Sequence, residues 1–203
     1  MTTSLSVTGD FYVKETLRRF LIKLWFPHSR LFWAFLFLGF LFYEACGLYF
    51  QYVLHLNPCI ECVYERACFM FFGIAALLGI TAPRFFMVRI LAVIIWLMSS
   101  IKGLLISIEH RGYELTKDDP FAETCGFFAD FPSWFKLDAW LPSVFAPTGI
   151  CGDASWEFAG LTMVQWIIII FVCNAVTAGL WVLLSCMPYR IYRKILNSGR
   201  VSE

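Results

Sequence analysis

Residues 57–69 read NPCIECVYERACF, and residues 67–82 continue as ACFMFFGIAALLGITA. The first stretch contains two cysteines in a C-x-x-C spacing, Cys59 and Cys62, followed by the ionisable pair Glu65 and Arg66. The second stretch contains no charged residue. Because roughly 20 predominantly apolar residues span the hydrocarbon core of a bilayer, the sequence predicts a membrane helix with two thiols and an ion pair at one end.

The composition of the whole chain also indicates a membrane protein. Of its 203 residues, 60% are hydrophobic and 15% are charged, whereas about 25% of residues are charged in a typical soluble domain. The sequence contains no basic stripe of the kind that neutralises nucleic-acid phosphates. We therefore expect an integral membrane protein without a nucleic-acid partner.

Four segments of the chain are long and apolar enough to cross a bilayer. They cover residues 31–54, 59–82 and 85–108, together with the uncharged stretch between Glu157 and Arg190. The predicted fold class is an all-α integral membrane protein, a four-helix transmembrane bundle within residues 31–187. Residues 1–30 and 188–203 are expected to be its tails.

The distribution of Lys and Arg predicts the orientation of the bundle. Both tails and the turn at residues 84–89 are basic, and with four spans they lie on one side, which the positive-inside rule makes the cytoplasm. Loops 51–58 and 109–160 then face the other side. Residues 1–30 lack the pattern of a signal peptide and are interpreted as a solvated tail or an amphipathic helix on the membrane.

Four cysteines are predicted to face the outer, oxidising compartment, where disulfides form and persist. Cys125 and Cys151 lie in the long loop, and a structural disulfide that closes this loop is the simplest interpretation of these two alone. Cys59 and Cys62 differ, because a C-x-x-C disulfide closes a very small ring and gains little stability from loop entropy. Their spacing favours a redox-active pair.

Metal binding is less consistent with the spacing of these four cysteines than redox chemistry is. Zinc sites also use C-x-x-C, but Cys125 and Cys151 do not form a second closely spaced pair, so no metal site is expected. The remaining cysteines lie inside the spans or at their inner ends, where buried cysteine usually packs as a small hydrophobe; they are Cys46, Cys68, Cys173 and Cys186.

The residues around Cys59 predict a helix start that favours thiolates. Asn57 is a suitable N-cap and Pro58 a suitable first helical residue, which places Cys59 in the first turn. Thiolates are stabilised near helix N-termini and beside cations. The local sequence is therefore typical of reactive rather than structural cysteine.

Arg66 follows Cys62 by one helical turn, so the two share a helix face. An ionisable residue in the bilayer region is costly and usually marks a functional site, and a planar guanidinium can hold a ligand that carries carbonyl groups. The alternatives are an ion pair with Glu61 or Glu65, or extension toward the lipid headgroups. A thiol pair at the bilayer edge can react with a soluble protein and a lipid-soluble acceptor, for which a quinone is the obvious choice.

These residues resemble a known family. PCIECVYER at 58–66 is similar to the P-C-x-x-C-x-Y-E-R signature of disulfide bond formation protein B (DsbB), a bacterial inner-membrane quinone reductase. The similarity continues through SSIKGLLISIEH, ending at His110, and through residues 120–166, which include the W-x-x-L-D-x-W-x-P core and two loop cysteines. The long N-terminal tail leaves a DsbI-like paralogue, which serves a dedicated partner, as an alternative.

The resemblance implies roles for individual residues. Cys59 and Cys62 would face the quinone, which would be ubiquinone, or menaquinone under anaerobic conditions. Arg66 would assist the quinone, and His110 matches a family position near it, the alternative being an ordinary interfacial histidine. Cys125 and Cys151 would exchange with DsbA, a soluble periplasmic thiol oxidase.

The implied reaction is a relay of disulfides. Reduced DsbA attacks Cys125, the freed Cys151 attacks Cys59, and the Cys62 thiolate passes electrons to the quinone. The enzyme would be a protein-dithiol:quinone oxidoreductase of the bacterial inner membrane, with both termini cytoplasmic and the redox loops periplasmic.

The loop between Cys125 and Cys151 is too apolar to lie free in water. We expect a short amphipathic helix on the outer leaflet or packing of the loop onto the bundle. The apolar residues concerned are Phe127, Phe128, Phe131, Trp134, Phe135, Leu137, Trp140 and Leu141.

Two other functions fit the coarse pattern. A four-span interaction protein with a disulfide-stapled outer loop, as in tetraspanins, would leave the C-x-x-C beside Arg66 unexplained. A vitamin-K-type reductase shares a four-helix core but carries its C-x-x-C on a later helix. Both are disfavoured.

Overall fold

The computed structural model describes residues 16, 28–119, 121, 125–126, 128–152, 156–186 and 188–197. Of residues 1–30, for which we considered an amphipathic helix, only Thr16 and residues 28–30 lie in this part of the chain. Four long helices dominate the structure: α2 (Arg30–Tyr52), α3 (Ile60–Thr81), α4 (Phe86–Thr116) and α7 (Met163–Ser185). All four are long and apolar enough to cross a membrane. The prediction of an all-α, four-helix membrane bundle is confirmed.

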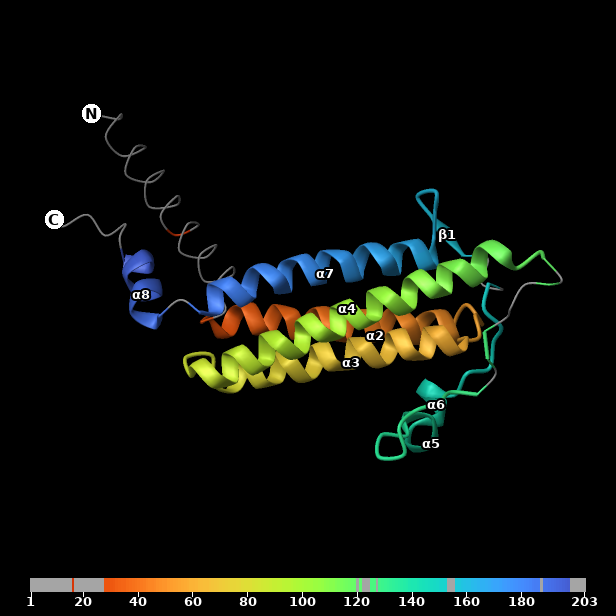
Figure 1. Cartoon of the computed structure of the whole chain (residues 1–203), viewed down its shortest axis with the longest axis horizontal. Coiled ribbons are helices and arrows are strands. Elements are labelled where there is room, and N and C mark those ends of the chain that lie inside the picture. The colour runs from red at the N-terminus through yellow and green to blue at the C-terminus, as the bar shows by residue number, and fades with distance from the viewer. Residues whose placement is uncertain are drawn as a thin grey trace, which may run out of the picture.

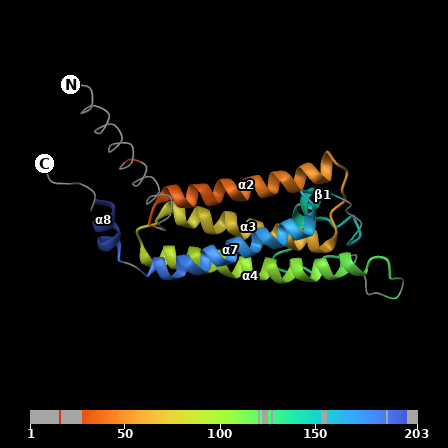
Figure 2. The same cartoon turned by 90° about the horizontal axis from the view of Figure 1, so that it is seen from above.

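The helices pack in chain order, α2 against α3, α3 against α4, and α4 against α7 (Figures 1 and 2). Cys59, at the start of α3, and His110, near the end of α4, lie at the same end of the bundle, which we call the cysteine end. α4 continues to Thr116, well beyond Ile108, where we expected the third span to end. This extension places His110 on a helix rather than in a loop.

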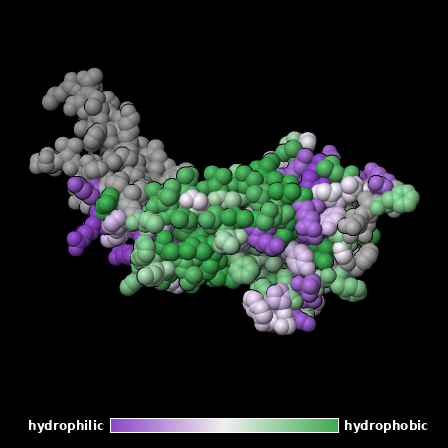
Figure 3. All heavy atoms as spheres, viewed as in Figure 1, coloured by the Kyte–Doolittle hydropathy of each residue, from purple (hydrophilic) through white to green (hydrophobic). Residues whose placement is uncertain are grey.

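Aromatic side chains form the core, in which Trp33, Phe72 and Phe171 are fully buried. Lipid is as apolar as these side chains, so close packing rather than water exclusion holds membrane helices together. Glycine permits that packing: a Cβ on Gly79 would lie 2.0 Å from the ring of Trp33, and a Cβ on Gly103 would lie 2.2 Å from Phe171. In Figure 3, hydrophobic residues cover the long middle of the face shown, as a bilayer requires.

A buried arginine fastens the opposite end of the bundle. Arg89 donates to the carbonyl oxygen of Ser185, at the end of α7, and to that of Pro83, in the α3–α4 turn. These bonds satisfy carbonyl groups that helix ends and turns leave without a partner. Beyond α7, the short helix α8 (Tyr189–Asn197) runs across the bundle direction (Figure 1).

The long connection between α4 and α7 contains two four-residue helices, α5 (Leu137–Trp140) and α6 (Pro142–Phe145). Leu137 and Phe145 are buried in one cluster with Val63 and Ala67 of α3, whereas Trp134 and Trp140 are exposed. The predicted short helix is therefore present as two turns docked on the bundle; Phe127 lies outside the described residues. The sequence did not predict the antiparallel hairpin β1 (Glu157–Phe158) and β2 (Leu161–Thr162) that precedes α7.

Candidate functional site

The start of α3 positions the C-x-x-C pair. The helix begins at Ile60, and Cys59 itself is the N-cap, its sulfur accepting the backbone N–H of Cys62 at 3.3 Å. The predicted cap at Asn57 and first position at Pro58 were therefore wrong by two residues. The Cys59 sulfur thus lies at the N-terminal end of the helix, where it caps a backbone N–H group.

The four outward cysteines form two pairs. The sulfurs of Cys59 and Cys62 are 2.8 Å apart as free thiols, and Cys125 is joined to Cys151 by a disulfide. Cys59, Cys125 and Cys151 form one buried cluster with Ile60, and the partly buried Cys62 packs against it. The pairing fits a loop staple as well as a redox pair, so the position of the disulfide relative to Cys59 is the more informative observation.

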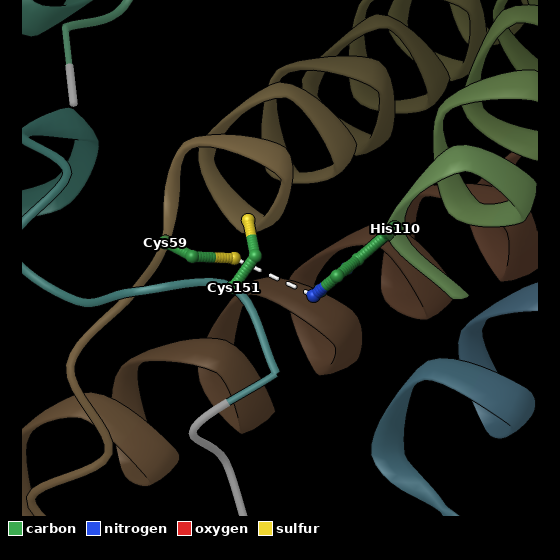
Figure 4. Close-up of side chains that lie close together, drawn as sticks. All are labelled: Cys59, His110 and Cys151. Carbon is green, nitrogen blue, oxygen red and sulfur yellow. Dashed lines mark hydrogen bonds between the residues drawn. The ribbon is translucent and has the colours of Figure 1, made fainter. Parts of the chain in front are cut away.

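The loop disulfide lies against the C-x-x-C pair. The sulfurs of Cys59 and Cys151 and a ring nitrogen of His110 all lie within 4.8 Å of one another. Figure 4 shows these three side chains converging from the start of α3, the loop and α4. The two sulfurs are therefore neighbours, and the arrangement allows direct exchange between the two pairs once a shift brings them to bonding distance.

Hydrogen bonds connect Glu65 to His110 and His110 to Cys59. The Nε2 atom of His110 lies 3.5 Å from the Cys59 sulfur, and Nδ1 lies 3.1 Å from a carboxylate oxygen of Glu65. All three residues are at most 3% exposed. A carboxylate that accepts from Nδ1 fixes the ring tautomer and leaves Nε2 free to accept a proton. This geometry lets His110 take the proton of the Cys59 thiol.

Arg66 connects α3 to α2 and to the loop. Its guanidinium donates to the side chain of Gln51 at 2.9 Å and to the carbonyl oxygen of Val144 at 2.5 Å, and it lies 4.0 Å from a carboxylate oxygen of Glu44. Its acidic partner is therefore Glu44 of α2 rather than Glu61 or Glu65, the partners considered from the sequence. Gly47 allows this approach, since a Cβ there would lie 3.1 Å from the guanidinium.

A cavity of about 260 Å³ opens beside these groups. Cys59, Cys62, Arg66 and His110 all line it, together with apolar residues of α2 and α7. Phe42, on its wall, is 64% exposed on the lipid-facing surface of α2. An apolar cavity with a few convergent polar groups is typical of a cofactor or ligand site.

The same side chains also include metal-binding types, but their spacing suits redox chemistry better. Two thiolates on one tetrahedral zinc ion would be roughly 3.8 Å apart, given Zn–S bonds of about 2.3 Å. The sulfurs of Cys59 and Cys62 are 2.8 Å apart, which is nearer to the length of a disulfide. His110 is also committed to Glu65 through Nδ1.

Residues 29–181 match the family described as disulfide bond formation protein DsbB. The chain belongs to the DsbB family. The disulfide bond formation protein B of Vibrio alginolyticus is 43% identical over 158 residues, covering 78% of this chain and 94% of that protein. The protein of the same name from Shewanella amazonensis is 45% identical over 147 residues, covering 72% and 85%.

Family membership confirms the predicted resemblance and the main prediction of function. The protein is a disulfide-generating oxidoreductase, and with four membrane-spanning helices it is a multi-pass protein of the inner membrane. The stapled interaction protein considered from the sequence is not supported.

The structure adds residues that sequence analysis did not select. Glu44 and Gln51 join Arg66, and Glu65 joins His110. Glu44 was the only charge in its span, a signal that marks function inside a membrane and that could have identified it. Glu65 is part of the family signature beside Arg66, but its bond to His110 joins two different helices, so no sequence pattern indicated that contact.

Proposed function

We propose that this protein oxidises a DsbA-type periplasmic dithiol oxidase and passes the two electrons to a membrane quinone. The observation that carries the proposal is the proximity of the Cys59 and Cys151 sulfurs beside the cavity. One pair of cysteines lies in the loop, where a soluble protein can dock, and the other lines a cavity between membrane helices. Electrons can pass between them by thiol–disulfide exchange.

The cycle begins at the loop disulfide. A thiolate of the reduced partner attacks Cys125 and releases Cys151, which then attacks Cys59 of an oxidised Cys59–Cys62 pair. The Cys62 sulfur leaves with the electron pair and lies on the cavity wall. The partner's second thiol resolves the mixed disulfide, which releases the oxidised partner and the Cys125 thiolate. Cys125 then attacks Cys151, so that the loop disulfide re-forms and Cys59 leaves as a thiolate. The reduced Cys59–Cys62 pair would be reoxidised by giving its two electrons to the quinone.

The cavity fits a quinone headgroup, and a bound quinone would supply a two-electron acceptor. Arg66 is the donor best placed to hold a quinone carbonyl, because it lines the cavity and is fixed by Gln51 and Glu44. His110 lines the cavity and also contacts Cys59, so we assign it to proton transfer at the thiol as well as to the quinone site. Ubiquinone is the expected acceptor, with menaquinone used under anaerobic conditions.

The choice of a quinone also has an energetic reason. Reoxidising a strongly oxidising dithiol oxidase requires an acceptor of higher potential, and for two electrons each difference of about 30 mV corresponds to about 1.4 kcal/mol. The glutathione pool is too reducing to serve. A respiratory quinone is sufficiently oxidising and reaches the cavity through the lipid.

The orientation follows from charge. The tails within residues 1–30 and 188–203 and the turn at 84–89 carry most of the Lys and Arg residues, so we place them in the cytoplasm. The cysteine end and the loop then face the periplasm, where disulfides persist. Residues 31–187 form the membrane domain in this proposal.

Anaerobic turnover tests the proposal. Purified protein in detergent receives a reduced DsbA-type oxidase and a soluble quinone, and the absorbance of the quinone is followed. We expect quinone reduction that is abolished in Cys62→Ser and retained in Cys173→Ser, which changes an exposed cysteine on α7. No reduction of ubiquinone or menaquinone analogues by the folded protein would reject the assignment.

A further inference from the structure

The segment that precedes Cys151 is fastened to the residue that precedes Cys59. The backbone N–H groups of Thr148 and Gly149 both donate to the carbonyl oxygen of Pro58, at 2.9 and 3.0 Å. Pro58 is buried and has no N–H of its own, so its carbonyl is its only backbone group for hydrogen bonding. These two bonds join chain segments that are distant in sequence. One segment ends directly before Cys59, and the other ends two residues before Cys151.

Gly149 makes this approach possible. A Cβ at this position would lie 2.3 Å from the carbonyl oxygen of Asn57 and 2.9 Å from its carbonyl carbon. Both are backbone atoms, which cannot rotate away as the end of a side chain can. Any other residue at position 149 would therefore push the loop away from Pro58 and lengthen both hydrogen bonds.

We propose that Gly149 is a positioning residue for the relay: by fastening the loop to Pro58, it holds the Cys151 sulfur beside Cys59 for exchange. The proposal rests on the proposed function, in which the Cys151 thiolate attacks the Cys59 sulfur. In that step a Cys59–Cys151 bond forms, the Cys59–Cys62 bond breaks, and the electron pair leaves on the Cys62 sulfur. Gly149 touches neither sulfur and acts through the backbone alone.

The two hydrogen bonds to Pro58 also explain how the loop cysteines can react with both the soluble partner and Cys59. Cys125 comes after the loop segment 117–124. Cys151, in contrast, comes two residues after a segment that is hydrogen-bonded to Pro58, at the start of α3. When the loop disulfide opens, Cys151 stays at Cys59, because those bonds do not depend on the disulfide. Cys125 is then free to remain with the soluble partner.

The test measures the Cys59–Cys151 disulfide directly, without quinone or partner. In a full-length background of Cys62→Ser and Cys125→Ser, the protein in detergent is equilibrated with reduced and oxidised glutathione. The disulfide is then quantified by mass spectrometry of proteolytic fragments. The equilibrium constant reports how closely the two thiols are held.

Gly126→Ala is the matched control, because Gly126 adjoins the other loop cysteine and a Cβ there would lie 3.7 Å from Ile60, an ordinary contact. We expect Gly149→Ala to lower the equilibrium constant at least tenfold and Gly126→Ala to change it less than twofold. A second variant, Thr148→Pro, removes one of the two N–H donors without adding bulk at position 149, and should give an intermediate loss.

Thermal unfolding of each variant establishes that the bundle is folded. Unchanged constants in Gly149→Ala and Thr148→Pro would overturn the proposal, and so would an equal loss in Gly126→Ala. Because the assay contains no electron donor or acceptor beyond glutathione, its result is independent of whether the protein reduces quinones. Failure of the anaerobic turnover experiment and failure of this experiment are therefore distinguishable.

Discussion

The substitution Glu65→Gln tests whether the carboxylate assists the thiol pair through His110. Glu65 accepts from Nδ1 of His110 at 3.1 Å, and both residues are almost fully buried. Glutamine keeps the size of the side chain and an acceptor oxygen but removes the negative charge. That charge stabilises the imidazolium that forms when Nε2 takes the proton of Cys59, so its loss should slow the step.

The size of the effect follows from the strength of the bond. A hydrogen bond to a charged group contributes about 1.5–3 kcal/mol and a neutral one about 0.5–1.5 kcal/mol. The difference between the charged and the neutral hydrogen bond is therefore about 1–1.5 kcal/mol. At about 1.4 kcal/mol for each factor of ten, Glu65→Gln should slow the reaction with quinone about five- to twelvefold.

A single-turnover experiment isolates the step. Enzyme reduced beforehand is mixed anaerobically with excess soluble quinone, and the loss of quinone absorbance is fitted to a first-order rate. Glu109→Gln is the control, since Glu109 is the exposed neighbour of His110 and contacts Tyr113; its rate should remain within twofold of the unsubstituted protein. A folded Glu65→Gln protein that reacts at the original rate, or two variants that are slowed equally, would refute the role of Glu65.

Two further substitutions test the surroundings of the site. Arg66→Lys keeps a positive charge but cannot reproduce the planar contacts with Gln51 and Val144. The KM for quinone should therefore rise about tenfold or more, while reduction of the loop disulfide continues. An unchanged KM would show that Arg66 does not bind the quinone. Gly79→Ala places a Cβ 2.0 Å from Trp33 and should destabilise the bundle by about 1–3 kcal/mol, measured by thermal unfolding in detergent. Gly39→Ala is its control on α2, where a Cβ would meet no described atom within 4 Å, and equal losses in the two variants would contradict the packing argument.

Sequence alone predicted the bundle because its main signal is local. Each span is a continuous apolar run, and length and charge suffice to recognise it. The exact start of α3 was not predictable in the same way, because Asn57, Pro58 and Cys59 are each acceptable near a helix N-terminus, and the packing of the loop onto Pro58 selects among them.

The structure brings the predicted candidate residues together, but the contacts among them were not predicted from the sequence. The catalytic and binding roles of these residues stay predictions. The C-x-x-C spacing and the family signature identified the four cysteines, Arg66 and His110. The bond between His110 and Cys59 joins residues 51 apart in the chain, and the contact of Arg66 with Val144 joins residues 78 apart. Contacts of that kind depend on how the helices and the loop meet, which a single sequence does not encode in any short pattern.

The burial of the relay has a consequence for its selectivity. The sulfurs of Cys59, Cys125 and Cys151 belong to residues that are only 2%, 4% and 8% exposed, so a small thiol diffusing in the surrounding water collides with very little of them. A protein that lifts the loop at Cys125 can therefore react much faster than glutathione, which reaches these sulfurs only slowly. The enzyme can thus stay shielded from wasteful reduction by bulk thiols through access alone, even when their redox potential would permit the reaction.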